Sequence, residues 1–186
     1  MIEVYRWRGN PFLHGIIGYT VTSLYVKKAI AFLQETQLPI SGLWIDCGCG
    51  RGHYMEALSY LGADPIIGID IRISLFNRAS PGLCICGDCR NLPLKDATGS
   101  GFLYVNVLHY SIKPLPLLEE AWRVVQSGGA LIIIEYDQHM PTGWNPYPLS
   151  RHSLETLLIK SGFSSVRSLQ VDRKYRPKNL IIGRKE

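Results

Sequence analysis

Hydrophobic residues along the chain fall into short continuous runs, separated by stretches in which they recur at helical spacing. Continuous apolar runs of about four to eight residues are typical of buried parallel strands, whereas recurrence every three or four positions indicates amphipathic helices. Their alternation predicts an α/β fold with a parallel sheet covered on both faces. The runs that we interpret as strands are LWIDC (43–47), PIIGID (65–70), LCICGD (83–88), FLYVNV (102–107), ALIIIEY (130–136), VRSLQV (166–171) and NLIIG (179–183).

Helical spacing predicts four helices beside these strands. The first, over residues 20–35, has one apolar face and leads into the sheet. Two more, over 54–61 and 117–125, connect consecutive strands, and the last runs from about residue 153 to 160. The connection CRNLPLKDATGSG (89–101) is too rich in proline, glycine and polar residues to predict a strong helix, so we expect an abbreviated crossover there.

The composition favours a single domain. A chain of 186 residues with 46% hydrophobic and 19% charged residues can bury a full core. We therefore expect one domain over residues 1–186, in which residues 1–40 form a helical segment that covers the site. No apolar run approaches the roughly 20 residues needed to cross a bilayer. The start, MIEVYRWRGN, lacks the pattern of a secretion signal, so we predict a cytoplasmic protein.

The five cysteines favour reduced, buried thiols. Their number is odd, and reduced thiols are the default for a cytoplasmic chain. Zinc sites usually space paired thiols by about two to four residues, and no histidine pair accompanies the CxC and CxCxxC spacings here, so metal ligation is the less favoured alternative. We expect no bound metal. The cysteines are Cys47, Cys49, Cys84, Cys86 and Cys89.

The chain carries a formal net charge of +5, and basic residues gather in its C-terminal quarter. Such a cluster attracts anions and is one feature of nucleic-acid-binding proteins. No recognised RNA-binding motif accompanies it, so a solvated basic face is the favoured interpretation and nucleic-acid binding is the alternative. The basic residues are Arg167, Arg173, Lys174, Arg176, Lys178, Arg184 and Lys185.

The stretch LWIDCGCGRG places alternating glycines directly after the first predicted strand. In an open parallel sheet, ligands bind beyond the carboxyl ends of the strands, above this turn. Gly48, Gly50 and Gly52 have no Cβ, so we expect a ligand to lie against the main chain. The spacing disfavours dinucleotides, because His53 stands where G-x-G-x-x-G needs its third glycine, and no phosphate-binding G-x-x-x-x-G-K-[ST] sequence is present.

Five segments in register resemble motifs of the Rossmann-like S-adenosylmethionine-dependent methyltransferases, in particular the small methyltransferase type 11 domain. The first is D-x-G-x-G-x-G from Asp46, and the second is the strand GIDI with its acid, Asp70. The segments GDCRNLPLKD, VNVLHY and AWRVVQSGGALIII are similar to later motifs of the family. The resemblance is dense over residues 43–136 and looser at SLETLLIKSGF. It departs from the family at Ser100-Gly101, where members commonly carry an acid.

This resemblance implies a three-layer Rossmann-like methyltransferase fold, with a seven-stranded, mostly parallel sheet and an antiparallel last strand. It also implies S-adenosyl-L-methionine as the cofactor. In that family the acid at Asp70 would bind the ribose hydroxyls, Ile71 would lie against the adenine, and Asp88 would accept from the adenine amino group. Each acid could instead only cap the turn that follows it. The residues expected at the cofactor are Asp46, Gly48, Cys49, Gly50, Gly52, Asp70, Ile71, Asp88, Cys89 and Asn106.

The acceptor side is predicted from the ends of the fourth and fifth strands. Methyl transfer from a sulfonium is an in-line displacement on an activated donor, so positioning in a dry site supplies much of the catalysis. If the acceptor must lose a proton, His109 is the best-placed base, and the alternative is a positioning or packing histidine. Catalytic candidates are Asn106, His109 and Tyr136, and substrate-binding candidates are Tyr19, Asp137, Trp144 and Tyr147.

We predict an S-adenosylmethionine-dependent methyltransferase that acts on a small molecule with an aromatic or apolar body. Met140, Trp144 and Tyr147 crowd the loop expected to cover the site, although ordinary loop packing would also account for them. The first alternative is methyl transfer to RNA or protein, with nucleic acid bound through the basic C-terminal region. The second is a non-catalytic, cofactor-binding regulatory subunit. The sequence leaves the oligomeric state open.

Overall fold

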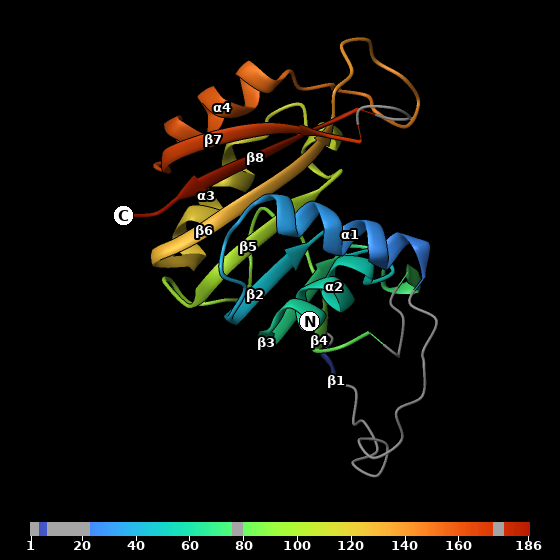
Figure 1. The fold of residues 1–186 in the computed structure, drawn as a ribbon, viewed down its shortest axis with the longest axis vertical. Helices are drawn as coiled ribbons and strands as arrows, with labels where there is room; N and C mark the ends of the chain where they lie inside the picture. The colour runs from blue at the N-terminus through green and yellow to red at the C-terminus, as the bar shows by residue number, and fades with distance from the viewer. Residues whose placement is uncertain (1–3, 7–22, 76–79, 173–176) are drawn as a thin grey trace.

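The computed structural model describes residues 4–6, 23–75, 80–172 and 177–186, whose strands form one mixed sheet (Figure 1). The strands are β1 (Val4–Arg6), β2 (Gly42–Cys47), β3 (Ala63–Asp70), β4 (Leu83–Cys86), β5 (Gly99–Val105), β6 (Val125–Tyr136), β7 (Ser164–Val171) and β8 (Lys178–Arg184). Their order in the sheet is β1-β4-β3-β2-β5-β6-β8-β7. Strands β4, β3, β2, β5 and β6 are parallel to one another, and β8 runs antiparallel to both β6 and β7.

The predicted fold class is confirmed. Seven strands lie where apolar runs predicted them, and β8, the last strand, is the antiparallel one. The structure adds an eighth strand, β1, which pairs antiparallel with β4 at the edge of the sheet. Three residues are too few to show the alternating or continuous hydrophobic pattern on which strand prediction depends.

Helices stand close to the predicted positions. Ser23 and Ser150 cap two of them, because each hydroxyl accepts from the backbone N–H three residues later. The helix expected over residues 20–35 begins at Leu24, and residues 20–22 lie outside the described part of the chain. As expected, residues 87–98 contain turns and no helix. The helical segments are α1 (Leu24–Glu35), α2 (His53–Leu61), η2 (Ile73–Leu75), η3 (Leu108–Tyr110), α3 (Leu115–Val124) and α4 (Arg151–Lys160).

The molecule has three layers, and one apolar cluster lies between the sheet and the helices on each of its faces. Helices α1 and α2 pack on one face of the sheet, and α3 and α4 pack on the other (Figure 1). Within the strands, successive residues join opposite clusters, as the pleat requires: Trp44 faces α1 and α2, whereas Ile45 faces α3 and α4. The carboxyl ends of the five parallel strands therefore meet at one edge, between the two helical layers. No helix among the described residues is long and apolar enough to cross a membrane.

One expectation about the cysteines is wrong. Cys47 at the end of β2 forms a disulfide with Cys89, although reduced thiols were expected throughout. Strand β3 lies between β2 and β4, so the segment after β4 has to fold across the end of β3 to bring the two residues together, with 6.3 Å between their Cα atoms. The spacing of the cysteines in the sequence does not reveal this loop path, so it could not predict the disulfide. Cys49, Cys84 and Cys86 remain free thiols.

Candidate active site

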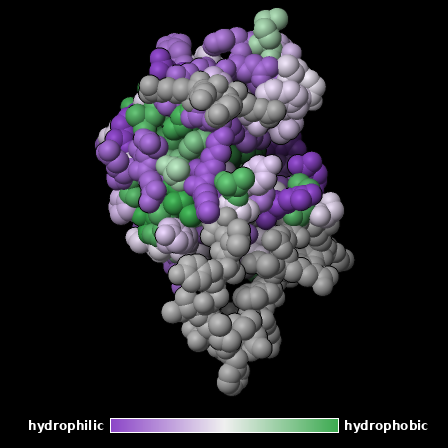
Figure 2. Space-filling model, turned by 45° about the vertical axis from the view of Figure 1, so that its right-hand side comes forward, coloured by the Kyte–Doolittle hydropathy of each residue, from purple (hydrophilic) through white to green (hydrophobic). Residues whose placement is uncertain are grey.

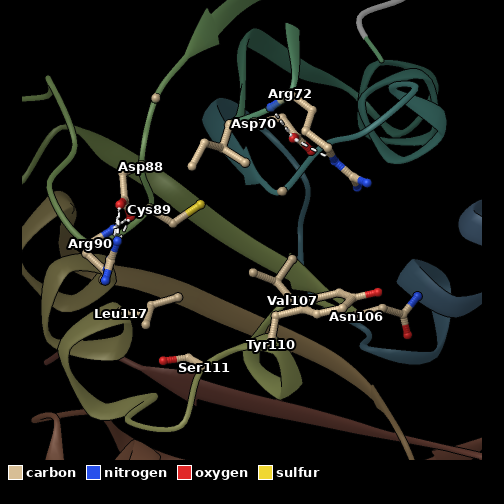
Figure 3. A pocket seen from close by; sticks show the side chains of 13 residues that line it. Asp70, Arg72, Asp88, Cys89, Arg90, Asn106, Val107, Tyr110, Ser111 and Leu117 are labelled. Carbon is tan, nitrogen blue, oxygen red and sulfur yellow. Dashed lines mark hydrogen bonds and ion pairs between the residues drawn. The ribbon is translucent and has the colours of Figure 1, made fainter. Parts of the chain in front are cut away.

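A cavity of about 470 Å³ lies at the carboxyl ends of the parallel strands. Figure 3 shows Asp88 and its neighbours on one side of this cavity and Asn106 on the other, with Asp70 between them at its upper rim. The lining residues therefore extend across the sheet edge from the end of β4 to the end of β5. Its lining is Gly48, Asp70, Ile71, Arg72, Gly87, Asp88, Cys89, Arg90, Asn106, Val107, Tyr110, Ser111 and Leu117.

The glycine turn is held against β3 and has a mixed role. The N–H groups of Gly48 and Cys49 both donate to the carbonyl of Ile69, which fixes the turn at the sheet edge. A Cβ at Gly48 would clash with Val107, whereas a Cβ at Gly50 would meet no atom within 4 Å. The remaining glycine, Gly52, similarly makes room for the side chain of Ser80. Gly48 lines the cavity although its missing Cβ also makes room for Val107, whereas Gly50 has open space around it but is not part of the lining. Gly52 allows close packing within the protein.

Asp70 occupies the end of β3 and is only 6% exposed. Its Oδ2 accepts from the N–H of Gly50 at 2.9 Å and its Oδ1 from the N–H of Arg72 at 2.8 Å. A carboxylate has about four acceptor sites, so it can still bind two ligand hydroxyls. The next residue, Ile71, is 68% exposed although it is apolar, and it lines the same cavity. An acid beside an exposed apolar side chain fits a ribose that carries a flat, apolar base.

Asp88 lies across the cavity and is paired with Arg90. The Arg90 guanidinium donates to both carboxylate oxygens, with Nε at 3.0 and 3.1 Å from Oδ1 and Oδ2. These hydrogen bonds hold the pKa of Asp88 below its usual range, so the group is ionised at neutral pH. For Asp88 to accept from an adenine amino group, Arg90 must share or release one carboxylate oxygen.

Asp46 and Cys49 do not line the cavity. Asp46 is buried beneath the glycine turn, and its Oδ2 has no hydrogen-bond partner among the described residues. Burial, and then the charges of Asp70 and Cys84, raise the pKa of Asp46 to about 8. Cys49 is hydrogen-bonded to Cys84 and buried, which raises its pKa. The Cys49 side chain belongs to the core, so only its backbone is placed to meet a ligand.

Asn106 marks the opposite end of the cavity. It follows β5 with a φ of +54°, and its N–H donates to the carbonyl of Ile134 at 2.9 Å. Its side-chain Oδ1 accepts from Nζ of Lys178 at 2.8 Å. The same ammonium group lies 4.2 Å from the ring centroid of Tyr136. The structure thus brings the catalytic candidates Asn106 and Tyr136 together through Lys178, a residue that the sequence did not single out as part of the site.

His109 is not part of the cavity lining. It is 2% exposed, and its Nδ1 lies 2.6 Å from Oε2 of Glu135. The other oxygen of Glu135 accepts from the N–H groups of Val107 and Leu108 at 2.8 and 2.7 Å. Glu135 and Tyr136 are consecutive strand residues, so their side chains leave β6 on opposite faces. Glu135 therefore holds the turn after β5 in place through its hydrogen bonds to Val107, Leu108 and His109.

The loop after β6 supplies part of the expected cover. The ring of Trp144 packs edge-on against Tyr136, with 4.7 Å between centroids, and the N–H of Tyr147 donates to the carbonyl of His109. Asp137, predicted to bind substrate, is instead tied to β7 and β8, because it accepts from Gln170 at 2.6 Å and from Asn179 at 3.1 Å. The other substrate candidate, Tyr19, lies outside the described residues.

The lining contains six of the ten residues expected at the cofactor: Gly48, Asp70, Ile71, Asp88, Cys89 and Asn106. Sequence reasoning missed Arg90, Glu135 and Lys178. An acid at the end of the apolar run LIIIEY was a usable signal for Glu135. Lys178 stood within a basic cluster and was assigned to a solvated face, so no local pattern indicated that it would be buried at the site.

Comparison with known proteins agrees with this geometry. A family model described as "Methyltransferase domain" matches residues 45–133, which include the glycine turn, Asp70, Asp88 and Asn106. Residues 45–133 belong to the methyltransferase domain family, and the fold is that of the Rossmann-like S-adenosylmethionine-dependent methyltransferases.

Individual relatives of this methyltransferase differ in what they act on. A tRNA (carboxymethyluridine(34)-5-O)-methyltransferase from Arabidopsis thaliana is 31% identical over 132 residues, which make up 64% of this chain and 31% of that protein. The 24-methylenesterol C-methyltransferase 2 of Oryza sativa subsp. japonica is 25% identical over 150 residues, 72% of this chain and 40% of that protein. The chain thus spans less than half the length of these curated relatives.

Among solved structures, an S-adenosylmethionine-dependent methyltransferase from Thermotoga maritima superposes with a TM-score of 0.69. The match covers 90% of this methyltransferase and 93% of the other chain, at 21% sequence identity. At this identity the likeness establishes the shared fold, and the acceptor has to be inferred from the residues of the present chain.

Proposed function

We propose that this methyltransferase transfers a methyl group from S-adenosylmethionine to a small acceptor with an aromatic or apolar body. The observation that carries the proposal is the form of the cavity. It offers an acid and an exposed apolar side chain at Asp70 and Ile71, and at its far end Asn106 adjoins Tyr136 and Lys178. A nucleoside fits the first pair, and the second end faces the covering loop.

The residues of the chain would hold the cofactor by familiar interactions. Asp70 accepts from the ribose hydroxyls, Ile71 packs on the adenine ring, and Asp88 accepts from the adenine amino group. When bound, the cofactor supplies a methyl group already activated by a sulfonium.

The acceptor would bind between Asn106 and the covering loop. Trp144 is 46% exposed, and Tyr147 and Met140 are also exposed, so these side chains can cover apolar surface without unfolding the loop. On the face shown in Figure 2, hydrophobic residues stand in small groups separated by hydrophilic ones. Trp144, Tyr147 and Met140 would provide local recognition of an apolar body. The idea that residues 1–40 help to cover it stays a prediction, because 7–22 are outside the described part of the chain.

His109 acts, in this proposal, as a positioning residue. Its imidazole is bound to Glu135 and does not line the cavity, whereas a general base has to reach the proton that it removes. The pair instead holds the turn that carries Asn106. Orientation and exclusion of water then supply most of the rate increase.

The test begins with binding. Calorimetric titration of S-adenosylmethionine should show binding to the wild type, and Asp70→Ala should weaken it about tenfold or more, because it removes a carboxylate bonded to the ribose and to Gly50. Asp70→Asn is the matched control, since it keeps one acceptor oxygen in a side chain of the same shape. Tight binding of NAD with no binding of S-adenosylmethionine would refute the proposal. Binding without transfer to any acceptor pool would favour the regulatory subunit.

RNA is the second candidate acceptor, because a curated relative is named as a tRNA methyltransferase. Splayed bases of single-stranded RNA stack on aromatic side chains, and Tyr110 and Trp144 are exposed near the cavity. Incubation with labelled cofactor and separate RNA and small-molecule fractions distinguishes the two candidates. A cytoplasmic location would agree with either acceptor and stays a prediction.

A further inference from the structure

We propose that the disulfide between Cys47 and Cys89 is a reversible redox site in the wall of the cofactor cavity, and that the oxidised protein binds the cofactor more tightly than the reduced protein. The inference rests on the proposed function, with the cofactor held by Asp70 and Asp88. It comes from the positions of the two cysteines and from the bonds that hold the segment carrying Cys89.

The fold determines which cysteines pair. Cys47 lies in the apolar cluster between the sheet and helices α3 and α4, and Cys89 packs against the same cluster. Cys49 and Cys84 lie in the cluster on the opposite face of the sheet, where their thiols are hydrogen-bonded to each other. Because the sheet separates the two pairs, the disulfide can open and close without exchange with these buried thiols.

The two sulfur atoms of the disulfide differ in access. Cys47 is 0% exposed, whereas Cys89 is partly exposed and lines the cavity beside Asp88 (Figure 3). Thiol–disulfide exchange begins when a thiolate reaches one of the two sulfur atoms. A reductant therefore attacks at Cys89, from the cavity, and a ligand that fills the cavity covers the point of attack.

The disulfide is also the direct tie between the segment after β4 and the end of β2. Among the described residues, the hydrogen bonds of residues 88–91 join these residues only to one another. On either side, the N–H of Gly87 donates to β3 at 3.1 Å, and the N–H of Leu92 donates to α3 at 2.7 Å. Reduction therefore frees the middle of the segment, which includes Asp88. A segment held in its binding conformation loses less entropy when the ligand binds, so the oxidised site binds more tightly.

A dithiol is the chemical class of reductant that completes the exchange. One of its thiolates forms a bond to Sγ of Cys89 while the bond between the two cysteine sulfurs breaks, and the electron pair passes to Sγ of Cys47, which takes up a proton. The second thiolate then attacks the reductant's own sulfur in the mixed disulfide, and Cys89 leaves as a thiolate that is protonated. The two cysteines gain two electrons and two protons, and the dithiol loses them and becomes a cyclic disulfide.

Cofactor binding and reduction have to affect each other by the same factor. If the oxidised protein binds S-adenosylhomocysteine about tenfold more tightly, saturating ligand shifts the thiol–disulfide equilibrium about tenfold toward the disulfide. One coupling constant can therefore be measured in two independent ways.

The first measurement is calorimetric titration of S-adenosylhomocysteine into the oxidised wild type and into the wild type reduced with dithiothreitol. We expect the reduced protein to bind about tenfold more weakly. Cys89→Ser should bind as the reduced protein does under both conditions. Cys86→Ser is the control and should keep the difference, because Cys86 is a free thiol outside the cavity lining. Equal affinities of the two wild-type forms, or tighter binding by the reduced form, would overturn the inference whether or not a variant folds. Binding to neither form would contradict the proposed function as well.

The second measurement is a redox titration of the wild type in mixtures of reduced and oxidised dithiothreitol. The cross-linked peptide that contains Cys47 and Cys89 is followed by mass spectrometry after free thiols are alkylated. Saturating S-adenosylhomocysteine should raise the ratio of reduced to oxidised dithiothreitol needed for half-reduction about tenfold. An unchanged ratio, or oxidised protein without this cross-linked peptide, would overturn the inference.

Discussion

The two halves of the cavity are built by different means. The cofactor half, formed by Asp70, Ile71, Asp88 and the glycine turn, takes its residues from positions immediately after the parallel strands β2, β3 and β4. The acceptor half consists of Asn106 in the cavity wall and, outside the lining, Tyr136, Lys178 and the loop over residues 137–150. It joins a parallel strand end to an antiparallel strand far along the chain.

This difference explains why one half can be interpreted from the sequence and the other cannot. A side chain that follows a parallel strand reaches the ligand edge wherever the strand lies in the sheet, so its role is visible locally. The contact between Asn106 and Lys178 joins residues 72 positions apart and depends on the register of β6 with β8. The following predictions, from the largest expected effect to the smallest, test this division.

Glu135→Ala should produce the largest loss of stability, and it acts on the acceptor half. The substitution leaves His109 and the N–H groups of Val107 and Leu108 without their buried acceptor, which we expect to cost about 3 kcal/mol. Denaturant unfolding followed by tryptophan fluorescence measures the change. Glu119→Ala, at an exposed position, is the control and should lie within about 0.5 kcal/mol of the wild type. Equal stability of the two variants would show that the buried pair does not support the turn.

Asp46 should make the stability of the ligand-free protein depend on pH, through the cofactor half. The pKa of Asp46 is about 8 in the folded protein, against an ordinary value of 3.8, so between these values the folded state keeps a proton that the unfolded state has lost. This group therefore lowers the stability as pH rises from about 4 to 8. Asp46→Asn removes the effect, so its melting temperature minus that of the wild type should increase over this range. A constant difference would mean that Asp46 has an ordinary pKa.

Gly48→Ala and Gly50→Ala test two roles of the glycine turn in the cofactor half, close packing within the protein and close approach of the ligand. Both positions have positive φ, so each substitution adds backbone strain of about 1 kcal/mol, and Gly48→Ala also forces Val107 to move. We expect Gly48→Ala to be the less stable variant by about 1 kcal/mol in thermal melts. Gly50→Ala should instead lose more cofactor affinity than stability. If Gly48→Ala lost more cofactor affinity than Gly50→Ala, the ligand would lie against Gly48, which lines the cavity, and not against Gly50.

Trp144→Ala should give the smallest effect, confined to the acceptor half. Loss of the ring that packs on Tyr136 should raise the KM for the acceptor several-fold and leave cofactor affinity within about threefold, because Trp144 does not line the cofactor cavity. Trp144→Phe is the control and should retain most of the activity. If cofactor affinity and transfer fall together, Trp144 supports the cofactor half and the division proposed here is incorrect.

The sheet was largely predictable from the sequence because its strands other than β1 and β7 contain short apolar runs. The six cofactor candidates found in the lining were predictable for the related reason that they follow strand ends. The disulfide of Cys47 and Cys89 was not, because it depends on a loop crossing the end of β3. The hydrogen bonds of Asp137 were not predictable, because Asn179 and Gln170 could not be aligned with it before the register was known. Its role at the substrate stays a prediction.

The central claim is that one ligand spans the cofactor half and presents its methyl group to the acceptor half. The most direct measurement is a crystal structure with S-adenosylhomocysteine. We predict ribose hydroxyls within hydrogen-bond distance of Asp70, adenine against Ile71, and the sulfur atom directed toward Asn106 and Tyr136. Adenine bound at Asn106, or a sulfur atom directed toward Asp88, would contradict the claim.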